Sequence, residues 1–214
     1  MILYDYPKAP NPMRVRLFIY EKKINIKTIL VDLRKQEQHK PKYLKLNPWG
    51  TYPFLKVNKK IINESIAICR YLEIKYPTPN LFGKSAMEQA LIEMLRRKVE
   101  IDGLNSVGEA FRNSAKAFKN RALPGPKKIM QIPALVKRGE YRTHLFFDFL
   151  DQHLKENRYI AANRFTIADI DAYVTYSFAK WIKIDGAKNR NNFKNWLKKI
   201  KERKSIKIYS NLFS

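Results

Sequence analysis

The stretch Asn47–Ser65, NPWGTYPFLKVNKKIINES, holds the pattern that decides the fold. Its first seven residues are rich in Pro and Gly and predict a tight turn. Two β-rich runs, Phe54–Val57 and Lys60–Ile62, follow on either side of an Asn-Lys pair and predict a hairpin. The polar residues Asn63-Glu64-Ser65 offer caps for a helix from about Ile66 to Lys75. The stretch therefore predicts a turn, a pair of strands and a helix.

The residues before this stretch predict a strand, a helix and a second strand. Ile2–Tyr6 is β-rich, and a Pro-rich turn separates it from Met13–Lys22, where apolar side chains recur at helical spacing. Ile24–Leu33 alternates in the manner of a strand. A β-α-β unit of this kind builds a parallel sheet, so the first 77 residues predict a small βαβ-ββα domain.

The residues after this stretch predict helices and few strands. Pro77–Gly83 breaks the periodic pattern and marks a domain boundary. Beyond it, apolar side chains recur at helical spacing in four segments, which are 86–118, 133–156, 166–181 and 189–203. We therefore expect an α/β domain over residues 1–77, a linker over 78–85 and an all-α domain over 86–214.

Composition excludes several classes of protein. The 214 residues are 45% apolar and 29% charged, which is typical of a globular chain and excludes a disordered or collagen-like one. The single cysteine, Cys69, excludes an internal disulfide, and the three histidines lack metal-ligand spacing, so we expect no metal. Asp5 interrupts the apolar N-terminus, and no uncharged stretch approaches the roughly 20 residues that span a bilayer. We expect a cytoplasmic protein with no membrane partner.

The formal net charge of +24 raises the question of an anionic partner. Basic residues outnumber acidic ones by 16 to 6 in residues 1–80 and by 27 to 13 in residues 81–214, so the excess is spread over both halves. Dedicated nucleic-acid sites usually concentrate Arg and aromatic side chains on one face. We therefore do not expect a nucleic-acid partner, and we interpret the charge as a solvated surface that favours small anionic ligands.

Four motifs together resemble the cytosolic glutathione transferases. They are Ala9-Pro10-Asn11-Pro12, the NPWGTYP turn of residues 47–53, the NESIAI helix start of residues 63–68 and Thr166-Ile167-Ala168-Asp169. Each motif is weak alone, but their order and the Pro53-to-Glu64 spacing are specific. The resemblance covers nearly the whole chain. It implies a thioredoxin-like N-terminal domain, a helical C-terminal domain, a homodimer and glutathione as the co-substrate of a detoxification reaction.

The resemblance also implies the glutathione contacts of the N-terminal domain. The peptide bond before Pro53 would be cis, and the backbone of Tyr52 would pair with the cysteinyl part of glutathione. Ser65 would bind the γ-glutamyl carboxylate at a helix N-terminus, and Glu64 would bind its amine. The alternative for Ser65 and Glu64 is a purely structural role as a cap and a dipole partner.

Three further contacts follow from the resemblance. Gln38 lies where some relatives contact the glycyl end of glutathione, and His39 could pair with the glycyl carboxylate. Asn105 lies where some relatives reach glutathione from the helical domain, and its alternative is an exposed helix residue. Phe111, Tyr173 and Trp181 either line a hydrophobic acceptor site or belong to the core.

The group that activates the thiol departs from the family pattern. The position of the usual hydroxyl or thiol donor is Ala9, which can donate nothing. Asn11 is the best substitute, since nu-class-like relatives use an asparagine amide there, and its alternative is an ordinary turn residue. The resemblance therefore predicts a glutathione transferase that conjugates small hydrophobic electrophiles. The alternatives are a glutathione-dependent disulfide reductase of nu-class type and a non-catalytic binding protein on the same fold.

The remaining residues of interest have structural explanations. Thr166 and Asp169 form the pattern of a helix capping box, with Phe165 and Ile170 as its hydrophobic staple. Cys69 lies on the apolar stripe of a predicted helix, and we expect it to be a buried core residue.

Overall fold

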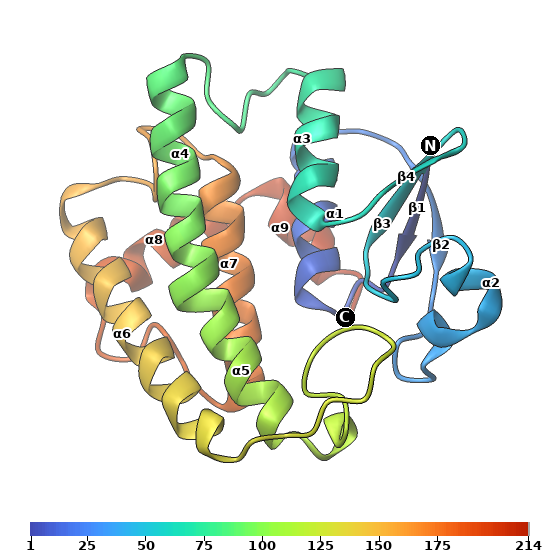
Figure 1. Cartoon of the computed structure of the whole chain (residues 1–214). Coiled ribbons are helices and arrows are strands. Elements are labelled where there is room, and N and C mark those ends of the chain that lie inside the picture. Colours follow the sequence, from blue (N-terminus) through green and yellow to red (C-terminus); the bar gives the residue numbers. More distant parts are fainter. Residues whose placement is uncertain (214) are drawn as a thin grey trace.

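The computed structural model describes residues 1–213 and begins with a four-stranded sheet in the order β2-β1-β3-β4 (Figure 1). β1 pairs parallel with β2 and antiparallel with β3, and β3 pairs antiparallel with β4. This topology confirms the predicted βαβ-ββα unit. The strand bounds are β1 Ile2–Asp5, β2 Lys27–Leu30, β3 Phe54–Val57 and β4 Lys60–Ile62.

Two helices, α1 (Pro10–Lys22) and α3 (Ser65–Lys75), pack between the sheet and the rest of the molecule, and the short α2 (Pro41–Leu44) lies beyond the sheet (Figure 1). α1 begins three residues before the predicted start at Met13, because proline is tolerated in the first turn of a helix, where its missing N–H has no partner to lose. Cys69 is completely buried in α3, as predicted.

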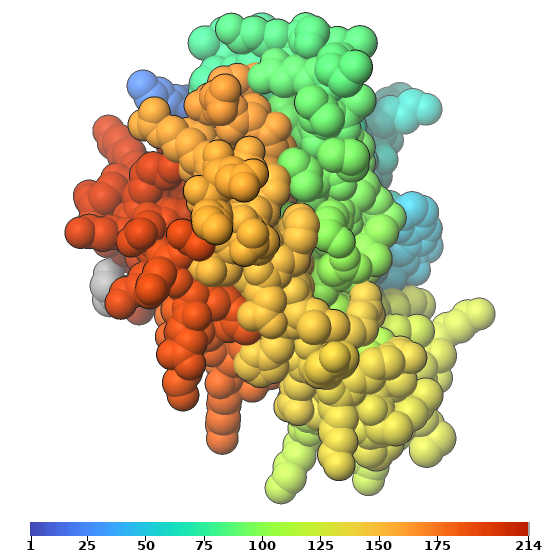
Figure 2. Space-filling model, turned by 90° about the vertical axis from the view of Figure 1, so that its left-hand side faces the viewer, coloured from blue at the N-terminus to red at the C-terminus, as the bar shows by residue number. Residues whose placement is uncertain are grey.

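The second half of the described chain is helical, and α7 runs through its middle, with all but one of its residues buried. α4 continues through a π-helical segment into α5, and α6 lies between α5 and α8 on the outer face (Figure 2). No helix in residues 1–213 has the length and apolar character needed to cross a membrane. The bounds are α4 Ala86–Lys98, π-helix Val99–Leu104, α5 Asn105–Ser114, α6 Ala134–Glu156, α7 Ile167–Ala179, α8 Asn191–Lys201 and α9 Lys204–Ser210.

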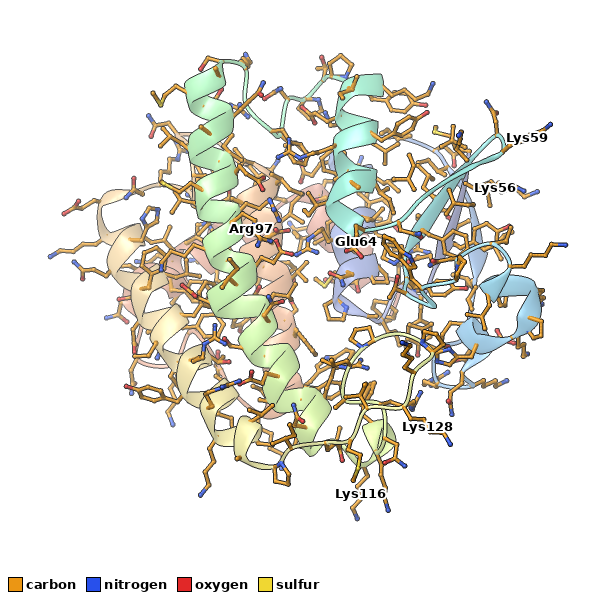
Figure 3. The ribbon with its side chains drawn as sticks, viewed as in Figure 1. Lys56, Lys59, Glu64, Arg97, Lys116 and Lys128 are labelled. Atoms are coloured by element: carbon orange, nitrogen blue, oxygen red, sulfur yellow. The ribbon has the colours of Figure 1, made fainter. Side chains whose placement is uncertain are left out.

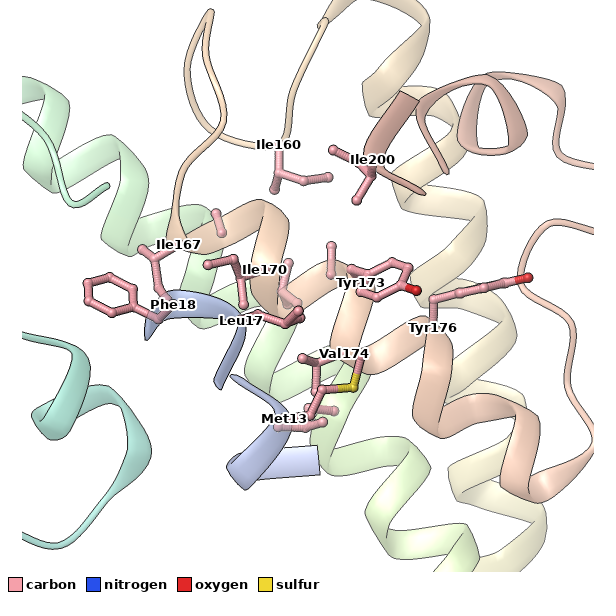
Figure 4. Close-up of a cluster of buried hydrophobic side chains, with 14 of the residues drawn as sticks. Met13, Leu17, Phe18, Ile160, Ile167, Ile170, Tyr173, Val174, Tyr176 and Ile200 are labelled. Atoms are coloured by element: carbon pink, nitrogen blue, oxygen red, sulfur yellow. The ribbon is translucent and has the colours of Figure 1, made fainter. Parts of the chain in front are cut away.

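One hydrophobic core joins the two halves. Met13, Leu17 and Phe18 of α1 face the side chains of α7, including Ile170 and Val174, in this core (Figure 4). Residues 76–85, which include the predicted linker 78–85, form no helix or strand. The division of the chain into two domains at that linker stays a prediction. Residues of α1 and α7 belong to the same hydrophobic core.

The capping box at the start of α7 is present as predicted. The buried carboxylate of Asp169 accepts hydrogen bonds from the backbone N–H groups of Thr166 at 2.9 Å and Ile160 at 3.0 Å, and from Trp196 Nε1 at 3.0 Å. The hydroxyl of Thr166, at 3.3 Å, is a fourth donor to the same carboxylate. Asp169 therefore holds α7, a preceding loop and α8 together, which is a structural role.

Candidate functional site

A buried arginine, Arg14, organises the point where α1, α3 and α7 meet. Its Nε donates to Asp171 Oδ1 of α7 at 2.6 Å, and its Nη1 donates to Asn11 Oδ1 and to Ser65 Oγ, each at 2.7 Å. Arg14 is 2% exposed, and Asp171 is fully buried. One guanidinium therefore fixes two predicted site residues from separate helices and ties them to the helical half of the chain.

The ion pair of Arg14 extends further into the helical half. Asp171 Oδ2 lies 3.5 Å from Arg96 Nη1, and Arg96 also pairs with Glu93 at 2.7 Å and Glu100 at 2.8 Å. Burial alone would lower the pKa of Arg96, but its hydrogen bonds to Glu93 and the charge of Asp171 raise that pKa above its ordinary value. Arg96 thus stays cationic, and the network links the site to α4.

The N-terminus of α3 presents Ser65 and Glu64. Ser65 is buried, and its hydroxyl lies 3.5 Å from Asn11 Oδ1 as well as accepting from Arg14. Glu64 is exposed and has φ 65° and ψ 121°, a conformation that non-glycine residues rarely adopt and that recurs at functional sites. It directly precedes the first turn of α3, at the lower end of that helix in Figure 3. The unpaired N–H groups of this turn favour an anion.

Asn11 is exposed in the first turn of α1, and its amide is oriented by the network. Its Oδ1 accepts from Arg14 Nη1 and lies within reach of the Ser65 hydroxyl. Within residues 1–213, the Nδ2 group makes no hydrogen bond. Because the oxygen is committed to Arg14, the amide leaves its two N–H bonds available to a ligand.

The peptide bond between Tyr52 and Pro53 is cis, as predicted. The Tyr52 side chain packs edge-on against Tyr43 and Phe54 in a second apolar cluster beside the sheet. Burial raises the pKa of the Tyr52 phenol, whose oxygen finds no hydrogen-bond partner. The side chain is thus part of the core, and only the backbone of Tyr52 is left for a ligand. A second cis bond, before Pro79, was not predicted.

Gln38 and His39 lie together in a short 3₁₀ turn, Glu37–His39, ahead of α2. Gln38 Oε1 and His39 Nδ1 are buried without a hydrogen-bond partner. Burial, and after it the charge of Arg121, lower the pKa of His39, so the ring is neutral at pH 7. Unsatisfied polar atoms in a buried setting favour a polar ligand at this turn.

The remaining predicted residues lie on the helical half. Asn105 begins α5 and is exposed. Tyr173 belongs to the core, which supports the second of its two interpretations. Phe111 and Trp181 are partly exposed, and their rings meet at 5.2 Å. No hydrogen bond among the described residues joins Asn105, Gln38 or His39 to the pair Asn11–Ser65.

Comparison with known proteins supports the arrangement of both halves. A family model described as "Glutathione S-transferase, N-terminal domain" matches residues 1–73, and one described as "Glutathione S-transferase, C-terminal domain" matches residues 137–211. Glutathione S-transferase F11 of Arabidopsis thaliana is 31% identical over 178 residues, which are 78% of this chain and 76% of the relative. The chain belongs to the glutathione S-transferase family.

Further relatives match almost the whole of this chain. Glutathione S-transferase 2 of Saccharomyces cerevisiae is 29% identical over 211 residues, which are 97% of this chain and 88% of the relative. The crystal structure of Gtt2 from the same yeast superposes with a TM-score of 0.89 and 28% identity, covering 98% of this chain and all of that one. A class Gtt2 enzyme of Vibrio parahaemolyticus gives a TM-score of 0.83 with 27% identity, covering 98% and 96%. These likenesses support a function of the glutathione transferase type.

The sequence does not predict the residue that organises the candidate site. An arginine between the apolar residues of an amphipathic helix is usually exposed, whereas the guanidinium of Arg14 is buried. The available signal was its position three residues after Asn11 and next to Val15, on the face that the apolar residues of α1 share. Its partner Asp171 lies 157 residues further along the chain.

Proposed function

We propose that this chain binds glutathione between its two halves and transfers the thiolate of glutathione to a small hydrophobic electrophile. The observation that carries the proposal is the single guanidinium of Arg14, which orients both Asn11 and Ser65. Its supports are the family membership and the unpaired N–H groups at the start of α3. The reaction forms a carbon–sulfur bond, expels the leaving group of the electrophile, and releases the thiol proton to solvent.

The γ-glutamyl end of glutathione is assigned to the start of α3. Ser65 Oγ and the first N–H groups of the helix would bind its carboxylate, because a helix N-terminus carries partial positive charge. Glu64 would bind the α-amine. The backbone of Tyr52, ahead of Pro53, would pair with the cysteinyl residue, as the family resemblance implies.

The thiol is assigned to Asn11. Its Nδ2 group would donate to the sulfur, and the cation of Arg14 lies directly behind the amide. A hydrogen bond and a positive potential both favour the thiolate over the thiol, and the thiolate is the nucleophile. This route needs no hydroxyl at Ala9. It also needs no protein thiol, which agrees with the burial of Cys69.

The other proposed contacts with glutathione are assigned to Gln38, His39 and Asn105. Gln38 and His39 would bind the glycyl end through their unsatisfied polar atoms, and Asn105 would approach from the helical half. Glutathione serves as a co-substrate, and the reaction requires no metal. We also propose a cytoplasmic homodimer, as is usual in the family; the exposed apolar residues Met87 and Met94 of α4 support an interface there.

A second candidate function is the reduction of disulfides by glutathione. The observation that favours it is that Ala9 stands at the position of the usual hydroxyl donor, which leaves the amide of Asn11 as the substitute. In this reaction the thiolate attacks a disulfide to give a mixed disulfide and a free thiol. A second glutathione thiolate then releases the other thiol and forms oxidised glutathione.

One purified sample distinguishes these functions. Turnover of 1-chloro-2,4-dinitrobenzene with glutathione, followed by the absorbance of the conjugate, supports conjugation. Reduction of 2-hydroxyethyl disulfide without conjugation supports the second candidate. Calorimetric binding of glutathione without either turnover identifies a binding protein and refutes both enzymatic proposals.

A further inference from the structure

The connection between α5 and α6 carries positive charge without acidic partners. No Asp or Glu occurs from Ala110 to Gly139. We call residues 112–128 of this segment the basic loop. None of its basic side chains pairs with a carboxylate elsewhere in residues 1–213. Those side chains are Arg112, Lys116, Lys119, Arg121, Lys127 and Lys128.

Two of these cations, Arg112 and Arg121, are partly buried. Arg112 Nε donates to the carbonyl oxygen of Ala122 at 2.9 Å, and its Nη2 donates to that of Arg121 at 2.7 Å. Burial and the nearby charge of Arg121 lower the pKa of Arg112 to about 10, so it remains cationic at pH 7. The carbonyl groups satisfy the N–H donors but leave the charge uncompensated. Partly buried charges are normally paired, so a carboxylate or similar anion would complete this cluster.

The basic loop lies against the proposed glutathione site. The charge of Arg121 contributes to the lowered pKa of His39, and a side-chain carbon added at Gly125 would lie 3.5 Å from the carbonyl oxygen of Trp49. Figure 1 shows the loop between α5 and the N-terminal half. Lys116 and Lys128 point outward at its edge (Figure 3). Arg112 and Arg121 therefore form its inner pair of charges.

An aromatic surface borders this pair of cations. The ring of Phe118 lies 4.5 Å from the Arg112 guanidinium carbon and 5.4 Å from that of Arg121. Phe118 meets Phe111 at 5.2 Å, and Phe111 meets the half-exposed Trp181 at 5.2 Å. Flat apolar surface next to an unpaired cation complements an aromatic ring that carries a negative group.

We propose that the basic loop selects acceptor electrophiles in which an anionic group is attached to an aromatic ring, and that Arg121 binds that group. The inference rests on the proposed conjugation. Phe111 and Trp181 contact the ring of the acceptor, while glutathione occupies the site at Ser65 and Asn11. With a chloroarene, sulfur replaces chlorine, chloride leaves, and the thiol proton passes to solvent.

The test compares two acceptors that differ in charge, 4-chloro-3,5-dinitrobenzoate and its methyl ester. For each acceptor, kcat/KM is divided by the rate constant of its uncatalysed reaction with glutathione. We expect this ratio to be about tenfold higher for the benzoate than for the ester, because one charge-assisted hydrogen bond is worth about that factor. Arg121→Gln abolishes this preference and leaves the ester within about twofold, while Arg121→Lys retains part of it. The control Lys194→Gln removes one positive charge at an exposed position of α8, and it should change the turnover of neither the benzoate nor the ester.

Other outcomes overturn the inference. Equal turnover of the benzoate and the ester by the unaltered protein refutes the selectivity but leaves conjugation standing. An equal loss for both acceptors in Arg121→Gln, with a raised KM for glutathione, assigns Arg121 to the glycyl end of glutathione instead. Absence of turnover with both acceptors refutes the proposed conjugation together with the selectivity. Thermal unfolding of each variant shows whether the fold is retained.

Discussion

Replacing Asp171 by Asn removes the buried charge that holds Arg14. Asp171 is fully buried and Arg14 is 2% exposed, so water cannot compensate either charge. Removing one partner of a buried ion pair costs about 3–5 kcal/mol. The Asn side chain still offers an oxygen to Arg14 Nε, so we expect about 3 kcal/mol, at the low end of that range. Arg96 keeps its two glutamate partners and adds little to the loss.

The assay is equilibrium unfolding in urea, with thermal unfolding as a second measure. A loss of about 3 kcal/mol lowers Tm by roughly 6–12 °C in a chain of this length. The control is Asp148→Asn, which breaks the exposed pair with Arg190 and costs at most about 1 kcal/mol. A loss in Asp171→Asn no larger than that of the control would refute the account of Arg14 as a buried, charge-held residue.

Replacing both Arg14 and Asp171 should affect the stability of the chain and its affinity for glutathione differently. Arg14→Met combined with Asp171→Leu removes both buried charges, and such replacements are often neutral or stabilising relative to the broken pair. We therefore expect the double variant to be more stable than Asp171→Asn. It still lacks the donor that orients Asn11 and Ser65, so its affinity for glutathione stays low. A double variant that regains both stability and affinity contradicts the positioning role of Arg14.

Three more predictions concern single residues. Asn11→Ala lowers kcat with glutathione by about tenfold or more with little change in stability, because it removes one donor to the sulfur. An unchanged kcat would show that another group activates the thiol of glutathione. Asp169→Ala lowers the unfolding free energy by about 3 kcal/mol or more, since four donors lose their acceptor. Loss of the exposed cap in Ser85→Ala costs only about 1 kcal/mol, and equal losses of the two variants in urea unfolding would contradict this expectation. Hydrogen bonds from Arg96 lower the pKa of Glu93 below its ordinary 4.5, so Glu93 contributes stability above that pH and loses it as the pH falls through the lowered value. Urea unfolding of Glu93→Gln between pH 6 and about 3 tests this, since the variant should show a weaker pH dependence than the unaltered chain.

The features that the sequence predicts correctly depend on short stretches. The hairpin over residues 54–62, the capping box at Thr166 and Asp169, and the burial of Cys69 follow from neighbouring residues, whose spacing sets local geometry. Such features carry their own signal in a single sequence. The cis bond before Pro53 was implied by the resemblance to the glutathione transferases rather than by local spacing.

The features that the sequence does not predict depend on contacts between distant residues. Arg14 finds Asp171 across 157 residues, and nothing near either residue specifies that partner. The π-helix between α4 and α5 arises where Gly103 packs so closely on Phe146 that a side-chain carbon there would lie 2.6 Å from the ring. The closeness of the basic loop to His39 likewise depends on how the two halves pack. The sequence therefore names candidate site residues but does not predict the network that joins Arg14 to Asn11, Ser65 and Asp171.

Calorimetric titration with glutathione tests the central claim most directly, namely that the site ordered by Arg14 binds this ligand. We predict saturable heat with about one glutathione per chain and a Kd below about 1 mM. Ser65→Ala, with its fold checked by thermal unfolding, should weaken binding by about tenfold, while Ser85→Ala at the start of α4 should bind normally. No heat from the unaltered protein at about 10 mM glutathione, or equal affinity in Ser65→Ala, contradicts the claim.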